Sequence, residues 1–375
     1  MNVEKFVEII KSDFYVGVPD SQLKKLCEFL LEKYGMESKH HIIAANEGNC
    51  VAIAAGYHLA TGKVPVVYMQ NSGEGNIVNP VVSLLNEKVY GIPMVFVVGW
   101  RGEPGVSDEP QHAFQGEITL KLLEDMGIST FVLEKETTEE NLEEVVHQFQ
   151  EKLSKGLQVA FVVKKNALEG NCSVEYENKG VLKREEVISH IVKVTGEDPI
   201  ISTTGKVSRE LFEVRTANGQ EHSCDFLTVG SMGHSSSIAL GVALASEDKR
   251  IWCIDGDGAA LMHMGAMGVI GAQKPKNLVH ILINNGAHES VGGMPTVVSE
   301  MDMVSIAKAC GYPYAKSVEN MADLEEELKQ VKERDELSFL EIKCAIGSRS
   351  DLGRPTLTPI RNKELFMEHI RDLNG

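Results

Sequence analysis

Positive charge and long apolar runs are both scarce in this sequence. Lysine and arginine number 37 against 54 aspartates and glutamates, so the 375-residue chain has a formal net charge of −17. A nonspecific nucleic-acid site or an anionic membrane surface would have to act against that charge, and we expect neither partner. Even the apolar stretch from Ile92 to Trp100 is far shorter than the roughly 18 residues of a membrane span.

Paired cysteine motifs are also missing. The 7 cysteines are scattered and include no CxxC pair, which argues against a zinc ribbon and against a thioredoxin-like redox pair. An odd, scattered set is typical of reduced thiols in a cytosol. The first 14 residues mix charged and apolar residues at helical spacing, unlike the uninterrupted apolar region of a signal peptide. We therefore expect a cytoplasmic protein whose first element is a helix.

The sequence does contain a repeated alternation of short β-branched runs and longer amphipathic stretches. The run Met94–Val98 is continuously apolar, as expected of a strand covered on both faces of a parallel sheet. Regular patterns lapse between about residues 164 and 183, where polar and small residues dominate. We predict two doubly wound, mostly parallel-sheet α/β domains at residues 1–168 and 184–375, joined by a linker at 169–183.

Six strands are expected in each domain, which suggests a repeated architecture. In the first domain they are expected at residues 14–18, 41–44, 65–70, 94–98, 130–133 and 159–163, and in the second at 199–202, 226–229, 250–254, 278–283, 314–318 and 339–344. The segment 348–359 is rich in proline, glycine and charge, so we expect no regular element there.

A glycine-flanked aspartate, Gly256-Asp257-Gly258, follows an apolar strand and precedes a helical stretch. Loops at the carboxyl ends of such strands bind ligands. Glycines in the turn let backbone N–H groups at the start of the helix approach a phosphate closely. Asp257 could then hold a hard cation against that phosphate.

Three familiar phosphate or metal motifs do not fit the chain. A dinucleotide-binding motif requires a third glycine where Leu261 stands, and a P-loop requires serine or threonine where Val207 follows Gly205-Lys206. A calcium-binding EF-hand that starts at Asp255 would require an oxygen ligand and a glutamate where alanines stand. The glycine turn therefore belongs to another kind of site.

A second oxygen-bearing side chain follows the next predicted strand. Asn285 stands at the end of that strand, with 26 residues between it and Gly258. Neighbouring parallel strands end at the same edge of a sheet, so we expect Asn285 and Asp257 to face one site. Carboxylate, amide and backbone carbonyl oxygens suit Mg²⁺, which keeps phosphate oxygens as partner ligands. The alternative to a metal site is that residues 256–258 form only a glycine turn capped by Asp257, and that Asn284 and Asn285 form an unrelated turn after the next strand.

The spacing of the glycine-flanked aspartate and Asn285 resembles the diphosphate and metal motif of thiamine diphosphate enzymes. The resemblance implies domains of the thiamine diphosphate-binding type, the first on the pyrimidine side of the cofactor and the second on the diphosphate side. It implies that Asp257, the Asn285 side chain and the Ala287 carbonyl bind Mg²⁺. The cofactor contacts implied in the second domain are Gly205, Ser231, Met232, Gly256, Gly258 and Ala259, with Met232 supporting the bent cofactor.

Glu47 is the matching candidate in the first domain. It stands after a predicted strand, at the start of a small-residue helix that resembles the corresponding segment of the family. By that resemblance its carboxyl would hydrogen-bond the aminopyrimidine ring and favour the tautomer that deprotonates the thiazolium carbon. Without the metal motif, an acid that complements a helix dipole would be the simpler interpretation.

Four loop segments, VGVPDS, GWRGEPGVSDEPQHAFQG, NNGAHESVGG and GSRSDLGRP, resemble those of phosphonopyruvate decarboxylases. Arg101, Arg349 and Arg354 lie in these loops and are candidates to bind a phosphonate as fixed cations. Single arginines more often form surface or inter-subunit ion pairs, which is the alternative for each.

The same resemblance gives candidate acid–base groups. Asp20 and His112 would assist proton delivery, and His288 would be a further substrate contact. A helix-capping aspartate is the alternative for Asp20, and a plain loop residue is the alternative for His288.

The resemblance implies decarboxylation of 3-phosphonopyruvate to phosphonoacetaldehyde and CO₂ with thiamine diphosphate and Mg²⁺, in phosphonate biosynthesis. Sulfopyruvate decarboxylase or another 2-oxoacid decarboxylase is the nearest alternative. A noncatalytic α/β protein that binds a nucleotide or sugar phosphate is the remote one. In this family the two domains of one site usually come from different subunits, so the resemblance also implies a homodimer or higher homo-oligomer with sites at the subunit interface.

Overall fold

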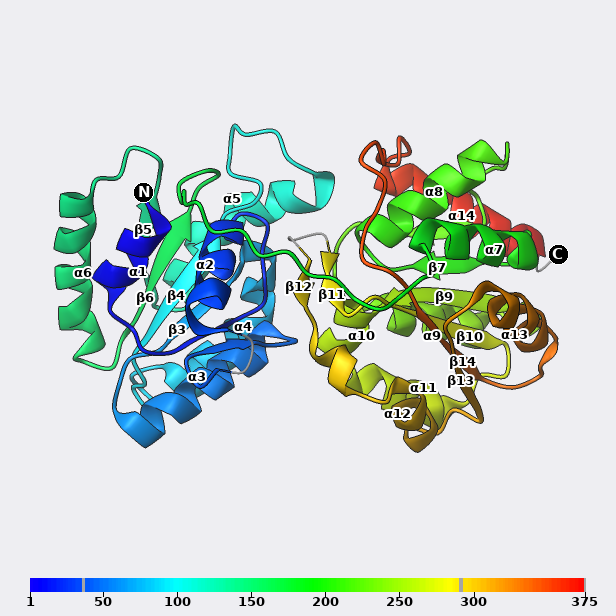
Figure 1. Cartoon of the computed structure of the whole chain (residues 1–375), viewed down its shortest axis with the longest axis horizontal. Helices are drawn as coiled ribbons and strands as arrows, with labels where there is room; N and C mark the ends of the chain where they lie inside the picture. Colours follow the sequence, from blue (N-terminus) through cyan, green and yellow to red (C-terminus); the bar gives the residue numbers. More distant parts are fainter. Residues whose placement is uncertain (36–37, 290–292, 374–375) are drawn as a thin grey trace. The chain divides into compact units, whose positions relative to one another are not determined.

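Two compact units, Met1–Glu175 and Tyr176–Gly375, make up the computed structural model, and each is built on a six-stranded parallel sheet (Figure 1). The structure describes residues 1–35, 38–289 and 293–373. The units divide inside the segment predicted to be a linker, and the domain boundaries at residues 168 and 184 stay predictions. In the described residues, no helix is long and apolar enough to cross a membrane.

The first unit alternates strands and helices, as the sequence predicted. Its strands are β1 (Tyr15–Gly17), β2 (His41–Ile43), β3 (Val66–Gln70), β4 (Met94–Gly99), β5 (Ser129–Leu133) and β6 (Gln158–Val163). Its helices are α1 (Val3–Ile10), α2 (Lys24–Tyr34), α3 (Glu47–Thr61), α4 (Glu74–Pro80), α5 (Pro110–Asp125) and α6 (Glu139–Leu153), with the short η1 (Asn71–Gly73) and η2 (Val81–Leu85) on either side of α4. β4 and β6 are buried along their whole length, as expected of strands covered on both faces.

The second unit repeats this alternation. Its main strands are β7 (Ile200–Ser202), β8 (Asp225–Leu227), β9 (Ile251–Gly256), β10 (Leu278–Asn284), β13 (Tyr314–Val318) and β14 (Ser338–Lys343). Its helices are α7 (Arg184–Thr195), α8 (Lys206–Ala217), α9 (Ser235–Ala245), α10 (Asp257–Met262), α11 (Gly265–Gln273), η4 (Val297–Glu300), α12 (Met303–Ala309), α13 (Met321–Glu333) and α14 (Pro359–Leu373).

The two sheets have the same topology, which confirms the predicted doubly wound architecture and its repeat. The strand orders are β2-β1-β3-β4-β6-β5 and β8-β7-β9-β10-β14-β13, written in the same direction. In each sheet the second strand lies on one side of the first and the third strand on the other. Ligands bind outside the carboxyl ends of the strands at such a switch point, here between β1 and β3 and between β7 and β9.

Helices cover both faces of the second sheet. Trp252 and Ile254 of β9 belong to a core with residues of α7, α8 and α13, whereas Ile251 and Cys253 belong to a core with residues of α9, α11 and α12. Successive residues of a strand point to opposite faces, so alternate residues of β9 enter the two cores.

A short antiparallel hairpin, β11 (Ala287–His288) with β12 (Met294–Pro295), was not predicted. Strands of two residues are too short to give a period-two pattern. Directly after β12, the Thr296 N–H donates to the carbonyl of Gly286, the residue before β11, at 2.9 Å. The hairpin therefore fixes the turn that follows Asn285.

Candidate active site

A pocket lies at the carboxyl ends of β7, β9 and β10. Asp257 begins α10 directly after β9, and Asn285 follows β10. The predicted residues that line this pocket are Gly205, Met232, Gly256, Asp257, Gly258, Ala259, Asn285, Ala287 and His288. The fold therefore brings together the predicted metal ligands and most of the predicted cofactor contacts.

Asp257 is buried among hydrogen-bond donors. The Gly258 N–H donates to its Oδ1 at 2.6 Å, and the Thr296 hydroxyl donates to its Oδ2 at 3.3 Å. Burial raises the pKa of Asp257 to about 6, although these donors act in the opposite direction. A cation beside the ionised carboxylate would offset the cost of its desolvation.

The Asn285 amide is bonded at both of its polar atoms. Its Oδ1 accepts from the Ala287 N–H at 3.1 Å, and its Nδ2 donates to Glu289 Oε2 at 2.8 Å. Its main-chain carbonyl accepts from Asn178 Nδ2 at 2.7 Å. Together with Asp257 and the Ala287 carbonyl, Asn285 gives an oxygen donor set of the kind Mg²⁺ prefers.

A network of charged side chains beside Asn285 was not predicted. Arg184 forms two bonds to Glu210, at 2.6 and 2.7 Å, and a further bond to Glu289. Lys206 donates to the other Glu289 oxygen at 2.7 Å. Burial acts to raise the pKa of Glu289, but its bonds to Arg184 and Lys206 hold the pKa below the ordinary value. Arg184, Lys206 and Glu289 line the pocket.

The sequence contains only weak indications of this network. Lys206 stood in the segment that failed the P-loop pattern, and Glu289 stood in NNGAHESVGG, of which residues 290–292 lie outside the described residues. Arg184 begins α7 far along the chain from Glu289, so no local pattern connects the two.

Two side chains pack closely against the main chain at Gly258. A Cβ at this position would lie 3.1 Å from the His288 ring and 3.2 Å from the Met232 methyl carbon. Burial lowers the pKa of His288 to about 4, so its ring is neutral at pH 7. Gly205, at the start of α8, has φ +90°, a left-handed conformation that favours glycine.

Ser231 lies in the loop after β8 and has φ +52°, uncommon for a residue with a side chain. It is not among the residues that line the pocket described above.

Glu47 lies at the first position of α3, in the first unit. Asn46 caps this helix, with its Oδ1 accepting from the Gly48 N–H at 2.8 Å. The Glu47 carboxyl is buried and accepts from Asn76 Nδ2 at 2.7 Å. Burial raises the pKa of Glu47 above its ordinary value, so the neutral acid is favoured over a wider pH range.

Asp20 and Arg101 lie at the carboxyl ends of β1 and β4, neighbours of β3 in the sheet. Asp20 is fully buried and accepts from Gln70 Nε2 at 2.6 Å, and burial raises its pKa. Arg101 forms a two-pronged ion pair with Asp108, with its Nε 2.8 Å from Oδ2. The predicted phosphonate contact is therefore already paired with a carboxylate.

His112 lies on α5, and its buried Nδ1 has no hydrogen-bond partner among the described residues. Burial lowers its pKa, with Arg101 acting in the same direction. Its ring is neutral at pH 7 and can accept a proton.

Glu74 is a buried acid in the first unit that was not predicted. It begins α4, and its Oε2 accepts a hydrogen bond from Gln115 Nε2 at 3.4 Å. Burial raises its pKa to about 9. Gln115 also donates to the Asn71 carbonyl, and the Asn71 side chain bonds the main chain of Arg101. Glu74 is therefore connected by hydrogen bonds to the loop that carries Arg101.

Arg349 is engaged by three carboxylates. It contacts Glu185 at 2.9 Å, Asp351 at 3.1 Å and Glu213. Neither Arg349 nor Arg354 is among the residues that line the pocket. The structure gives Arg349 the ion-pair environment that was the alternative to a substrate contact.

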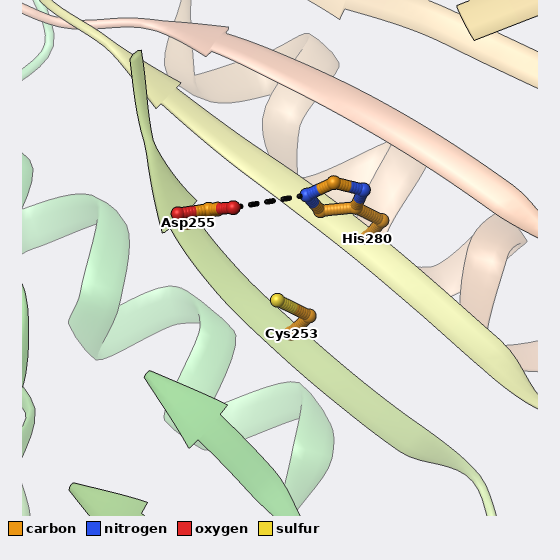
Figure 2. A group of neighbouring side chains, drawn as sticks. All are labelled: Cys253, Asp255 and His280. Carbon is orange, nitrogen blue, oxygen red and sulfur yellow. Dashed lines mark ion pairs between the residues drawn. The ribbon is translucent and has the colours of Figure 1, made fainter. Parts of the chain in front are cut away.

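Cys253, Asp255 and His280 form a second group of potential metal ligands (Figure 2). Cys253 and Asp255 lie on one face of β9, and His280 lies on β10 with its Nε2 3.5 Å from Asp255 Oδ2. All three are buried, and the described residues give three ligands where a structural zinc site uses four. His280 Nδ1 also lies 3.1 Å from the Tyr312 hydroxyl. We interpret the group as a polar part of the core.

Two family models match the chain, one in each unit. The family model described as "Thiamine pyrophosphate enzyme, N-terminal TPP binding domain" matches residues 3–124, and the corresponding "C-terminal TPP binding domain" matches residues 203–342. The second match covers Asp257 and Asn285, and the first covers Glu47.

Curated relatives are similar over nearly the whole chain. A phosphonopyruvate decarboxylase from Streptomyces viridochromogenes is 33% identical over 371 residues, which cover 94% of this chain and 90% of the relative. One from Streptomyces hygroscopicus is 31% identical and covers 94% and 89%. A sulfopyruvate decarboxylase from Methanosarcina acetivorans is 28% identical and covers 98% and 97%. The chain belongs to the phosphonopyruvate decarboxylase family of thiamine pyrophosphate enzymes.

Proposed function

We propose that the protein decarboxylates 3-phosphonopyruvate to phosphonoacetaldehyde and CO₂, with thiamine diphosphate and Mg²⁺, in phosphonate biosynthesis. The observation that carries the proposal is the pocket in which Asp257, Asn285 and Ala287 stand together. The names of the two Streptomyces relatives support this substrate. Sulfopyruvate is the second candidate, because the Methanosarcina relative matches over 97% of its length, at a lower identity of 28%.

The pocket suits a metal-bound diphosphate. Asp257, the Asn285 side chain and the Ala287 carbonyl would bind Mg²⁺ through oxygen. Gly205, Gly256, Gly258, Ala259 and Ser231 would let the main chain approach the diphosphate, and Met232 would support the cofactor. When bound, thiamine diphosphate supplies the electron sink that a 2-oxoacid lacks.

Glu47 would act on the cofactor from the first unit. Its buried carboxyl has a raised pKa, so it can hold a proton for a ring nitrogen of a bound aminopyrimidine. Asn76 keeps that carboxyl oriented through its bond to Oε2.

Arg101 would bind the phosphonate, with Asp108 orienting the guanidinium. Asp20, whose pKa is raised by burial, and His112, whose pKa is lowered by burial, would hold and deliver the proton that replaces CO₂. Arg349, Arg354 and His288 are further candidates for substrate contact, and Arg349 would first have to leave its carboxylate partners.

We propose that the chain works as a cytoplasmic homodimer or larger homo-oligomer with sites at the subunit interface. Relatives named as alpha and beta subunits of sulfopyruvate decarboxylase support an assembly of more than one chain. Free cysteines at all 7 positions agree with a reducing compartment.

Release of CO₂ from phosphonopyruvate by the purified chain tests the proposed function. We expect release to require added thiamine diphosphate and Mg²⁺ and to fall at least about 100-fold in Glu47→Gln, because a positioned general acid–base group contributes 10²–10⁴-fold. Glu124→Gln, on the exposed side of α5, is the matched control and should behave like the unchanged chain. Release that survives Glu47→Gln would contradict the proposed role.

A further inference from the structure

The Asn285 side chain can serve a cation in only one of its two orientations. Its amide ends in one oxygen and one NH₂ group of nearly equal size, and only the oxygen can bind a metal ion. Space alone therefore does not decide which atom faces Asp257. A hydrogen-bond partner must decide it.

We propose that Glu289 is a positioning residue that turns the Asn285 amide oxygen toward the metal site. The inference rests on the proposed function, because it concerns the metal ligand assigned there. Glu289 Oε2 lies 2.8 Å from Asn285 Nδ2, and an ionised carboxylate can only accept hydrogen bonds. The NH₂ group must therefore face Glu289, which leaves Oδ1 beside the Ala287 N–H.

Asn285 and Asp257 line the same pocket, and Ala287 lies beside both. The Ala287 N–H donates to Asn285 Oδ1 at 3.1 Å and also lies close enough to the Asp257 carboxylate to act to lower its pKa. Asn285 Oδ1 and the Asp257 carboxylate are thus near the same N–H. This shared neighbour places the oxygen on the side where the proposed ion binds.

Glu289 cannot easily turn away, because two cations hold it. Arg184 bonds the same carboxylate oxygen that accepts from Asn285, and Lys206 bonds the other oxygen at 2.7 Å. Arg184 is itself fixed by its two bonds to Glu210. Outer partners of this kind orient metal ligands, and their loss typically weakens metal binding 10- to 100-fold.

The neighbouring asparagine provides a matched control within the same turn. Asn284 Nδ2 donates to Glu341 Oε1 at 2.7 Å, and Asn284 Oδ1 accepts from the Gly286 N–H at 3.0 Å. This arrangement copies that of Asn285 and Glu289, but neither Asn284 nor Glu341 lines the pocket.

Glu289→Gln should reverse the Asn285 amide. The glutamine has one oxygen, which can serve Lys206 or Arg184 but not both. Arg184 keeps its two bonds to Glu210, whereas Glu289 is the carboxylate that pairs with Lys206 in the described part of the chain. We therefore expect the oxygen beside Lys206 and the NH₂ group in the Oε2 position, facing Asn285. Asn285 would then present its oxygen to the glutamine and its nitrogen to the metal site. The Mg²⁺ concentration that half-saturates thiamine diphosphate binding, measured by calorimetry, should rise about 10- to 100-fold. Glu341→Gln should leave it unchanged.

A second substitution separates orientation from general damage. Asn285→Asp places an oxygen at both ends of the side chain, so its orientation no longer matters. Asn285→Asp alone should weaken the Mg²⁺-dependent binding of thiamine diphosphate, because the new carboxylate would lie beside the Glu289 carboxylate and be repelled by it. Combined with Glu289→Gln, it should restore binding to within about threefold of the unchanged chain, since the glutamine NH₂ can donate to it.

The outcomes are distinct. Raised Mg²⁺ demand in Glu289→Gln with rescue by Asn285→Asp supports the inference, while equal behaviour of Glu289→Gln and Glu341→Gln overturns it. Loss in Glu289→Gln without rescue also overturns it, because a merely structural role would give that result. An unchanged chain that binds thiamine diphosphate without any Mg²⁺ dependence would overturn the proposed metal site and this inference together.

Discussion

Gly258 lines the proposed cofactor pocket, and two side chains pack closely against it. Its main chain is enclosed by the His288 ring and the Met232 methyl group, both slightly more than 3 Å from where a Cβ would stand. An added methyl group in such a position forces neighbours to move, at a cost of about 1–3 kcal/mol. Met232 and His288 both line the pocket, so they would move within the proposed cofactor site.

We therefore expect Gly258→Ala to weaken thiamine diphosphate binding about tenfold, measured by calorimetry in saturating Mg²⁺. Gly268→Ala is the control, because a Cβ in this part of α11 meets no atom within 4 Å. It should leave binding unchanged and stabilise the fold by up to about 1 kcal/mol, as alanine is the better helix former. Equal cofactor affinity in both variants would contradict the account of Gly258.

At the scale of single residues, the sequence predicted those parts of the site that follow neighbouring strands. Asp257 and Asn285 follow neighbouring strands, so their spacing along the chain indicated that they meet. Arg184 and Glu289 are 105 positions apart and meet only through the folded sheet. Arg101 was predicted as a cation for the substrate, but the fold of its loop pairs it with Asp108. Such pairings depend on loop conformation, which no periodicity encodes.

The start of α4 carries a carboxyl that the fold keeps neutral. Glu74 is completely buried, and its Oε1 has no hydrogen-bond partner among the described residues. Its pKa is about 9 in the folded chain and near 4.5 without that burial. Between these values the unfolded chain has lost the proton that the folded chain retains. The Glu74 contribution to stability therefore falls as pH rises from about 4.5 to 9.

Glu74→Gln should remove this pH dependence, because an amide cannot ionise. We expect the gain in melting temperature over the unchanged chain to be larger at pH 8 than at pH 5, by several degrees. Glu124→Gln, at an exposed site on α5, should show no such pH-dependent gain. Thermal unfolding followed by circular dichroism at both pH values measures the difference, and an equal effect at pH 5 and 8 would rule out the assigned burial effect.

At the scale of elements, the twelve strands of the two large sheets could be predicted because buried parallel strands are apolar and β-branched. The pair β11–β12 could not, since its strands have two residues each and are too short to show a period-two pattern. That hairpin carries Ala287 and His288, so the missed element supports the predicted site. Helix capping is a second feature at the scale of elements: Asn46 caps α3 and so fixes the start of this helix at Glu47.

Over the whole molecule, one topology occurs twice, and each copy carries half of the proposed machinery. Glu47, Asp20 and Arg101 belong to the first unit, and Asp257 and Asn285 belong to the second. The proposed interface sites combine the first unit of one chain with the second unit of another. A symmetric dimer would then contain two equivalent sites.

Co-expression of two inactive variants tests this arrangement. A chain with Glu47→Gln lacks the proposed acid–base group of the first unit, and a chain with Asp257→Asn lacks a proposed metal ligand of the second unit. A dimer of either variant alone would therefore have two defective sites. In a mixed dimer one site would carry both changes and the other neither, so random pairing should restore about a quarter of the activity. If each site lies within one chain, the mixture should stay inactive, and recovered activity is therefore the result that supports shared sites.

The central claim concerns the substrate, and a comparison of kcat/KM for phosphonopyruvate, sulfopyruvate and pyruvate tests it most directly. All three should be measured with thiamine diphosphate and Mg²⁺, in the unchanged chain and in Arg101→Gln. We predict that phosphonopyruvate is preferred and that Arg101→Gln raises its KM at least about tenfold while pyruvate is little affected, because the lost bond is made to the phosphonate. A higher kcat/KM for sulfopyruvate or pyruvate, or an equal loss for all three acids in Arg101→Gln, would contradict the claim.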